Sequence, residues 1–256
     1  MKTKKIIALL VLLAAIGTMG FAGSQLAKAQ RIYREGSTAY DDLRGKAKQP
    51  QAPQPPPAQK PQIDIPRLGI DFGALRTVSK DTAAWLYSPG TVIDYPVMRA
   101  NDYDYYLHHL PGGAQNANGS LFIDYNNAPD FSGPLTVIYG HHMRSGMMFG
   151  SLKGYKTQAY YDEHPFMYLY TPGGDYRLEL LYGCVIAMGQ WRDRAFMYPE
   201  NLSSLLAYAA RNTTFKSSVS YAPGDRIVAM STCSYEFDNA RYVVIGILRP
   251  TESEDQ

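Results

Sequence analysis

The residues with the clearest chemical potential are a cysteine and an arginine near the C-terminus. Cys233 ends one apolar run, Arg241 begins the next, and a polar loop joins them. If residues 226–233 and 241–248 are paired strands, the thiol and the guanidinium lie side by side at the rim of a sheet. A thiolate there is a candidate nucleophile, and the arginine is suited to hold a thiolate, a carbonyl or an oxyanion. Such a pair needs a third group to transfer protons.

Two histidines at another predicted strand end offer that group. His141 and His142 follow the apolar run 135–139 and Gly140. A reactive cysteine needs a basic or cationic neighbour, because the thiolate is the nucleophilic form. The three side chains together would supply a nucleophile, a proton donor and an electrostatic stabiliser. By spacing alone, a structural role for each of them is the simpler alternative.

The second cysteine, Cys184, is predicted to be a buried, inert thiol. It lies within the continuous apolar run 178–188, which is typical of a cysteine that packs as a small hydrophobe. We do not expect a disulfide between Cys184 and Cys233, because a single bridge builds no framework in a domain of this size.

Composition excludes several other classes of function. The net charge is only +2, and Lys and Arg do not cluster among aromatic residues, so we expect no nucleic acid partner. The histidine pairs at 108–109 and 141–142 raise the idea of zinc, yet no Cys/His spacing fits a closed zinc site, and no acidic cluster suits calcium. We therefore expect no metal and no cofactor.

The N-terminal segment predicts a membrane anchor. Lys2, Lys4 and Lys5 precede a charge-free stretch over residues 6–27, close to the ~20 residues that span a bilayer. This arrangement keeps residues 1–5 in the cytoplasm and places the rest of the chain outside the cell. A cleaved signal peptide is the alternative, because Ala27-Lys28-Ala29 has the small-residue spacing of a cleavage site. We favour the uncleaved anchor, since the apolar region is longer than in a typical signal.

A spacer is predicted to separate this anchor from one globular domain. Residues 28–66 indicate a polar stalk, helical in part, that leads into a linker with seven of the seventeen prolines between residues 50 and 66. Such a linker behaves as a semi-rigid extended spacer. Residues 67–250 then form the catalytic domain, and residues 251–256 form an acidic tail.

The pattern of that domain is mainly β. We predict strands over residues 120–125, 135–139, 166–171, 176–188, 226–233 and 241–248, with a hairpin turn at 171–175. A helix over residues 199–212 begins with Pro199 and Glu200, and shorter helices are predicted over 81–87 and 157–163. Many short strands with few helices indicate a small barrel or a sandwich.

Three separated motifs resemble class B sortases, which are cysteine transpeptidases of Gram-positive bacteria. The histidine region and the cysteine–arginine hairpin of that family resemble Tyr139-Gly140-His141-His142-Met143 and Ser231-Thr232-Cys233-Ser234-Tyr235 with Arg241. Its N-terminal region resembles Trp85-Leu86-Tyr87, Ile93-Asp94-Tyr95-Pro96-Val97 and Tyr105-Tyr106-Leu107-His108-His109. The resemblance covers residues 63–248. One departure is that Ala229-Met230 stand where the family has Thr-Leu.

The resemblance implies an eight-stranded sortase barrel, with one longer helix beside the groove, behind an N-terminal transmembrane helix. It implies that Cys233 attacks the Thr carbonyl of an Asn-Pro-x-Thr-like C-terminal sorting signal and forms a thioacyl intermediate. His141 would pass protons to and from the amines, and Arg241 would hold the carbonyl or the oxyanion. His142 is expected to be structural. The same match suggests substrate-groove roles for Tyr139, Ser231, Thr232, Tyr106 and Leu107.

The implied partners are surface proteins or pilins that carry a sorting signal. The acceptor is an amine of a cell-wall stem peptide or a pilin lysine, and the lipid bilayer holds the N-terminal helix. Three alternatives stay open from sequence: a pilin-polymerising sortase, a cysteine protease that uses water, and a non-catalytic peptide-binding surface protein. The presence of all three residues, Cys, His and Arg, argues against the last alternative, because a protein that only binds peptides does not need them together.

Overall fold

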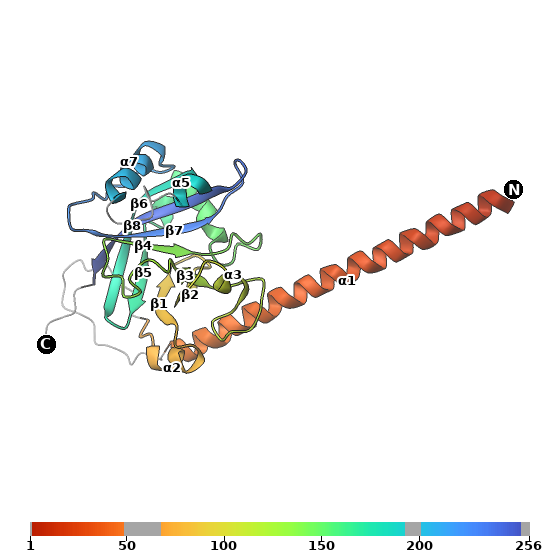
Figure 1. The fold of residues 1–256 in the computed structure, drawn as a ribbon, viewed down its shortest axis with the longest axis horizontal. Helices are drawn as coiled ribbons and strands as arrows, with labels where there is room; N and C mark the ends of the chain where they lie inside the picture. Colours follow the sequence, from red (N-terminus) through yellow and green to blue (C-terminus); the bar gives the residue numbers. More distant parts are fainter. Residues whose placement is uncertain (1, 49–67, 193–200, 252–256) are drawn as a thin grey trace.

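A computed structural model describes residues 2–48, 68–192 and 201–251 (Figure 1). The predicted linker over residues 50–66 lies outside the described residues. So do Pro199, Glu200 and the tail beyond residue 251.

Eight strands close into a barrel in the order β1-β2-β3-β4-β7-β8-β6-β5, which confirms the predicted fold (Figure 1). Neighbouring strands are antiparallel except for the pairs β2–β3 and β4–β7. The bounds are β1 Thr82–Tyr87, β2 Asp94–Arg99, β3 Leu121–Ile123, β4 Leu135–Tyr139, β5 Phe166–Thr171, β6 Gly174–Ala187, β7 Arg226–Cys233 and β8 Ala240–Pro250.

We predicted a helix over residues 81–87, and this prediction is wrong, because residues 82–87 form strand β1. This strand pairs with β2 on one edge and with β5 on the other, so its backbone hydrogen bonds are made between strands. A short apolar run fits either structure by periodicity, and here pairing within the barrel decides. We did not predict strand β2, which contains Pro96. The strand tolerates this proline, because its pairing with β3 begins only at the next residue, Val97.

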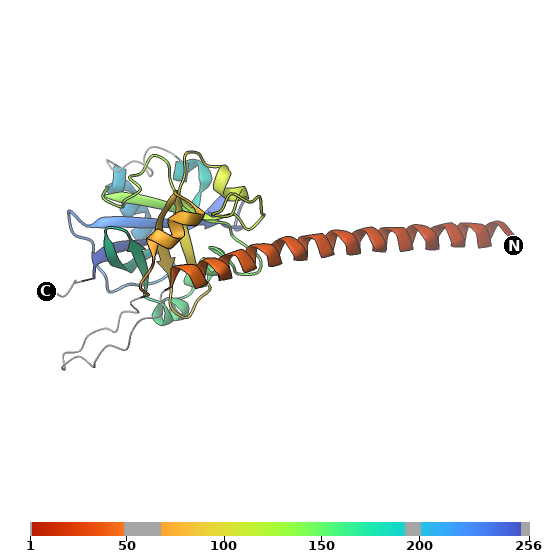
Figure 2. The same ribbon diagram turned by 90° about the horizontal axis from the view of Figure 1, so that it is seen from below.

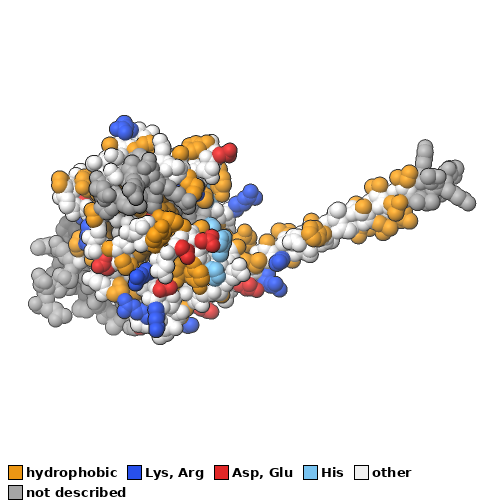
Figure 3. Space-filling view, in the orientation of Figure 1, with side chains coloured by type: hydrophobic (Ala, Val, Ile, Leu, Met, Phe, Trp, Pro, Cys, Tyr) orange, Lys and Arg blue, Asp and Glu red, His pale blue; other side chains and the backbone are white. Residues whose placement is uncertain are grey.

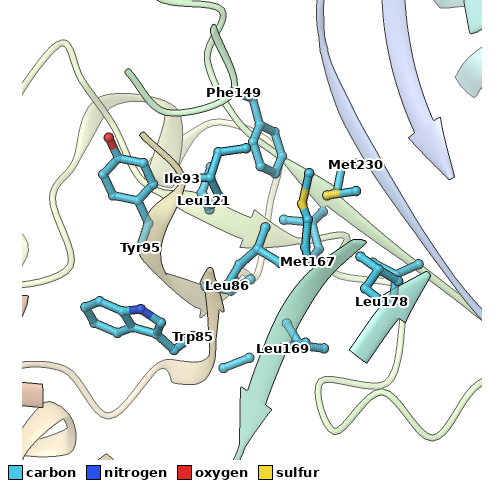
Figure 4. Packing of buried hydrophobic residues seen from close by; sticks show 14 of the residues in the cluster. Trp85, Leu86, Ile93, Tyr95, Leu121, Phe149, Met167, Leu169, Leu178 and Met230 are labelled. Carbon is cyan, nitrogen blue, oxygen red and sulfur yellow. The ribbon is translucent and has the colours of Figure 1, made fainter. Parts of the chain in front are cut away.

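Buried hydrophobic side chains form a larger cluster, to which β1 and β5 contribute from both of their faces, and a separate outer cluster. The larger cluster includes Leu86, Met167 and Met230 (Figure 4). The outer cluster lies over β4, β6, β7 and β8 and is covered by α5 (Met188–Arg192) and α7 (Leu202–Asn212). Helix α7 confirms the described part of the predicted 199–212 helix, and it buries Leu202, Leu205, Leu206 and Ala209. The substrate-facing chemistry predicted for Cys233 belongs to this outer face.

Four shorter helices fill the connections. They are α2 (Phe72–Val78), α3 (Tyr105–His108), α4 (Gln158–Glu163) and the 3-10 helix η1 (Gly150–Lys156). Helix α4 agrees with the predicted helix over residues 157–163, and Thr157 caps its N-terminus by accepting a hydrogen bond from Tyr160 N.

Helix α1 (Lys2–Ala47) is continuous and projects away from the barrel (Figures 1 and 2). Hydrophobic side chains cover much of its projecting part (Figure 3). The end of α1 differs from the polar stalk that we expected, because Tyr40, Leu43 and Ala47 are buried in the larger cluster. Asp94 of β2 adds an ionic contact, with Lys48 Nζ 2.6 Å from its carboxylate. The last turns of α1 are therefore part of the folded unit.

Candidate active site

Cys233 and Arg241 lie directly opposite each other where β7 meets β8, as the sequence predicted. Residues paired in this way present their side chains on the same face of a sheet. Both residues are half-buried. The Arg241 guanidinium is 3.0 Å from the carbonyl oxygen of Ala240 and 3.1 Å from the sulfur of Met188. Within residues 2–48, 68–192 and 201–251, no carboxylate forms an ion pair with Arg241, so its charge is available to a bound group.

The histidine segment is joined to β7 immediately beside the cysteine. Strands β4 and β7 run parallel, with Tyr139 aligned to Ser231. Beyond β4, Gly140 N donates to Ser231 O at 3.2 Å, and Thr232 Oγ1 donates to Gly140 O at 2.8 Å. His141 therefore follows directly after the residue that bonds to both Ser231 and Thr232, the two residues before Cys233.

The imidazole of His141 is held by a backbone carbonyl. Its Nε2 is 2.7 Å from the carbonyl oxygen of Leu107. Because a carbonyl only accepts hydrogen bonds, Nε2 carries a proton, and Nδ1 is left to exchange a proton with a reacting group. Burial lowers the pKa of His141, the hydrogen bond to Leu107 opposes this effect, and neighbouring His108 lowers the pKa further.

His142 contacts the cysteine through its backbone. Its Nδ1 is 2.8 Å from the carbonyl oxygen of Cys233, to which it donates. The edge of its ring meets Tyr235, with ring centroids 5.2 Å apart. These contacts fit the structural role that we expected for His142, and they fix the backbone that carries the thiol.

Gly140 lets the histidine segment pass closely over the core, and we expect Gly140→Ala to disturb it. A Cβ at this position would lie 2.4 Å from Leu121 and 2.7 Å from the ring of Phe149. Such overpacking typically costs about 1–3 kcal/mol, and each kcal/mol lowers the Tm of a domain of this size by about 2–4 °C. Thermal unfolding should show this loss, and peptide cleavage should fall because His141 is displaced.

Gly133→Ala is the matched control for that experiment. A Cβ on Gly133 would meet its nearest neighbour at 3.7 Å, which is an ordinary contact. We expect a Tm and a cleavage rate close to those of the unchanged protein. Equal effects of the two substitutions would contradict the packing argument.

The five predicted groove residues differ in their surroundings. Tyr139 and Ser231 lie on the same side of the wall as Cys233, and the buried Ser231 Oγ has no hydrogen-bond partner among the described residues. Thr232 and Tyr106 have their polar atoms engaged within the protein, since Thr232 bonds to Gly140 and Tyr106 Oη donates to Asp81 at 2.7 Å. Leu107 contributes its carbonyl to His141. Contact of any of them with a peptide stays a prediction.

A buried carboxylate beneath Tyr139 was missed by sequence reasoning. Asp124 is 1% exposed and accepts hydrogen bonds from Tyr139 Oη at 2.9 Å and Tyr103 Oη at 3.0 Å. Burial and the Asp124 charge both raise the pKa of Tyr139 and of Tyr103, so the two hydroxyls stay protonated donors. The available signal was an aspartate directly after the apolar run of β3. The network fixes the tyrosine rings beside the predicted groove.

The loop that follows Cys233 is tied to helix η1. Lys156 Nζ donates to Ser234 Oγ at 2.9 Å and forms an ion pair with Glu236. Burial opposes ionisation of Glu236, but hydrogen bonds from Lys156 and Ser234 outweigh it and lower the pKa of Glu236 to about 2. Because this pKa is depressed from 4.5, the tether is complete above pH 4.5 and is lost as the pH falls through about 2. The backbone N–H groups after the thiol are therefore held in place at neutral pH.

Cys184 has the properties of an inert thiol. It is 0% exposed, and burial raises its pKa to about 12. Both cysteines are free. Cys233 is thus the accessible thiol of the chain. In the part of the chain that the structure describes, no group of three or more His, Cys, Asp or Glu is placed to hold a metal ion.

Similar proteins are known by sequence and by structure, although no family model matches the chain. A protein named Sortase B from Listeria monocytogenes serovar 1/2a is 32% identical over 179 residues, covering 68% of this chain and 72% of that protein. A Staphylococcus aureus sortase B–substrate complex matches with a TM-score of 0.64 and 26% identity, covering 71% of this chain and 85% of that chain. Bacillus anthracis sortase B in complex with AAEK1 matches with a TM-score of 0.70 and 25% identity, covering 86% of this chain and 99% of that chain.

Proposed function

This chain belongs to the sortase B family of cysteine transpeptidases, and from that membership we propose that Cys233, His141 and Arg241 are its catalytic residues. The observation that carries the assignment is the meeting of three strand ends. Cys233 pairs with Arg241 across β7 and β8, and the segment that carries His141 leaves β4 where it bonds to Ser231 of β7, which supports a role for all three. An accessible thiol, a histidine that can exchange a proton and a guanidinium without an ion pair among the described residues are the functions that acyl transfer needs.

We propose the following sequence of bond changes. The Cys233 thiol gives its proton to His141 Nδ1, the resulting thiolate attacks the carbonyl carbon of the scissile peptide bond, and the carbonyl oxygen becomes an oxyanion. The C–N bond then breaks, and His141 gives its Nδ1 proton to the leaving amine, which leaves a thioester on Cys233. An incoming amine attacks that thioester and loses a proton to His141. The C–S bond breaks, and the thiolate is restored.

Arg241 is proposed to stabilise the charge that develops on the carbonyl oxygen. Its guanidinium is permanently charged and presents several N–H donors in a planar fork. The partner-free Ser231 Oγ supports a further hydrogen bond to the bound peptide, because a buried hydroxyl without a partner is costly unless a ligand satisfies it. Tyr139 would form the neighbouring groove wall, held by Asp124.

The proposed substrate is a surface protein that carries an Asn-Pro-x-Thr-like C-terminal sorting signal, cleaved after Thr. The proposed acceptor is an amine of the cell wall, such as that of a stem peptide. The resemblance of the motifs around Cys233, His141 and Leu107 to the family supports both choices. A pilin lysine as the acceptor is the second candidate, since it requires the same amine chemistry.

Product analysis tests this function. The protein is incubated with a labelled Asn-Pro-x-Thr peptide, with and without a small amine such as triglycine, and the products are separated by chromatography. A new peptide–amine conjugate is the expected result, and a peptide with Ala in place of Thr should remain intact. Hydrolysis alone, at a rate that the amine does not change, would instead favour the cysteine protease. No turnover of the Asn-Pro-x-Thr peptide, with or without the amine, would favour a binding protein.

We propose that residues 6–27 anchor the protein in the cell membrane, with residues 1–5 inside and the catalytic domain, residues 67–250, outside. Helix α1 is long and apolar enough to cross a membrane, and three lysines precede its apolar part. Near this segment, the Ile32 carbonyl of α1 accepts a hydrogen bond from Asn116 of the loop between α3 and β3. Ile32 is five positions after residue 27, which is about 8 Å along a helix. The barrel would therefore lie close to the outer membrane surface.

Labelling with a membrane-impermeant maleimide tests this orientation. On intact cells we expect one thiol per chain to react, because Cys233 is accessible and Cys184 is buried. Cys233→Ser should remain unlabelled, which identifies the reactive thiol. Labelling that requires disruption of the membrane would contradict an external catalytic domain.

A further inference from the structure

The end of helix α1 lies against the loop that connects α3 to β3. Asn116 Nδ2 donates to the Ile32 carbonyl at 3.0 Å, and Gly36 packs so closely on Asn118 that a Cβ at Gly36 would lie 2.1 Å from its side chain. One turn further along α1, Tyr40 is 1% exposed. These contacts join the proposed membrane-proximal helix to the loop over three successive turns.

Tyr40 makes the contact that reaches furthest into this loop. Its Oη donates to the carbonyl oxygen of Gly119 at 2.5 Å and lies 3.2 Å from Ser120 Oγ. Ser120 in turn donates through Oγ to His109 O at 2.8 Å and through its backbone N–H to Tyr106 O at 2.7 Å. Tyr40 therefore fixes the residues that run back along α3.

The same residues lie against the carbonyl that holds the histidine. Gly119 has a φ of +57°, and a Cβ there would lie 2.6 Å from the Leu107 oxygen. That oxygen accepts the hydrogen bond from His141 Nε2 at 2.7 Å. Gly119 and the Leu107 carbonyl therefore have no room for a side chain between them, and a shift of Gly119 should move the acceptor of His141.

We infer that Tyr40 is a positioning residue for His141, acting through Gly119, Ser120 and the Leu107 carbonyl. This inference rests on the proposed catalytic role of His141. The end of α1 would then have a second role besides anchoring, because the helix that carries the membrane span also sets the position of the proton-transfer group. Loss of the Tyr40 hydroxyl would leave the Leu107 carbonyl less fixed and its hydrogen bond to His141 weaker.

Several charged or titratable groups surround His141 and must be considered in any titration. His108 of α3 has its ring centroid 6.4 Å away and pairs with Asp104. His142 is its neighbour in the chain, and Cys233 and Arg241 lie at the ends of the adjoining strands β7 and β8. Because the hydrogen bond to Leu107 stabilises the charged imidazolium, weakening it should lower the pKa of His141. Removal of the charge of His108 should have the opposite effect.

The test is Tyr40→Phe in the full chain, held in detergent micelles. The ring stays in the core against Tyr95, with centroids 5.0 Å apart, while the hydroxyl is lost. We expect kcat for peptide cleavage to fall about 3- to 10-fold, with KM changed less than twofold. The His141 pKa, followed by NMR of labelled imidazoles, and the acid limb of the pH–rate profile should both move to lower pH.

Tyr33→Phe is the matched control, because Tyr33 is an exposed tyrosine on the same helix. It should leave kcat and the His141 titration unchanged, whereas His108→Gln should raise the His141 pKa. Ser120→Ala removes the second link of the chain and should reproduce the Tyr40→Phe shift even if Tyr40→Phe folds poorly.

Two outcomes would overturn the inference. One is an unchanged His141 pKa in Tyr40→Phe and Ser120→Ala; a lower Tm beside it would show that Tyr40 only packs. The other is an equal shift in Tyr33→Phe. Failure of the proposed function would look different: His141→Gln would keep the full cleavage rate, while the NMR titration of Tyr40→Phe would still report on the position of the ring.

Discussion

Cys233→Ala is expected to lower the rate of sorting-signal cleavage by about 10⁴-fold or more, because the thioester step has no other nucleophile. Cys233 is half-buried at the end of β7, so its truncation should leave the Tm within a few degrees. Cleavage of a quenched fluorescent peptide and thermal unfolding measure the two quantities on the same sample.

Cys184→Ala provides the matched control for this prediction. Its thiol is fully buried within the outer cluster, so we expect a lower Tm and a cleavage rate close to that of the unchanged protein. Cleavage that survives Cys233→Ala, or that is lost in Cys184→Ala without unfolding, would show that the nucleophile has been misassigned.

Arg241→Ala is expected to lower kcat by about 10²- to 10³-fold, the usual cost of removing a main oxyanion donor. Arg241→Lys should recover only part of this loss, because an ammonium keeps the charge but lacks the planar fork. Single-turnover measurements with an Asn-Pro-x-Thr peptide would place the defect in the formation of the thioester. The guanidinium has no ion pair among the described residues, so the fold should be retained.

Arg249→Ala tests whether this effect belongs to the site. Arg249 lies at the other end of β8 and pairs with Asp225. Its loss should lower stability without a comparable effect on kcat. A full cleavage rate in Arg241→Ala would refute the role proposed for Arg241.

The pairing of Cys233 with Arg241 was predictable because it depends on local sequence. Two apolar runs joined by a short polar loop favour a hairpin, and the register then follows from the loop. Strand β1 was not predictable in the same way, since its residues are strand only because β2 and β5 pair with them. Closure of the barrel depends on the same long-range pairing.

The contacts that orient the site were harder to find in sequence. The carbonyl of Leu107 reaches His141 across 34 residues, and a backbone acceptor has no sequence signature. The docking of α1 did leave a signal, because Tyr40, Leu43 and Ala47 recur at helical spacing in an otherwise polar stretch. The burial of Asp124 was as hard to predict as the Leu107 contact, because it becomes evident only once Tyr103 and Tyr139 converge on the carboxylate.

Mass spectrometry of the trapped acyl-enzyme tests the central claim most directly. The protein is incubated briefly with an Asn-Pro-x-Thr peptide, quenched in acid and digested. We expect the fragment that contains Cys233 to gain the mass of the peptide up to and including Thr, and an added amine should remove that mass. Continued turnover with no adduct on Cys233, or an adduct on another residue, would contradict the account.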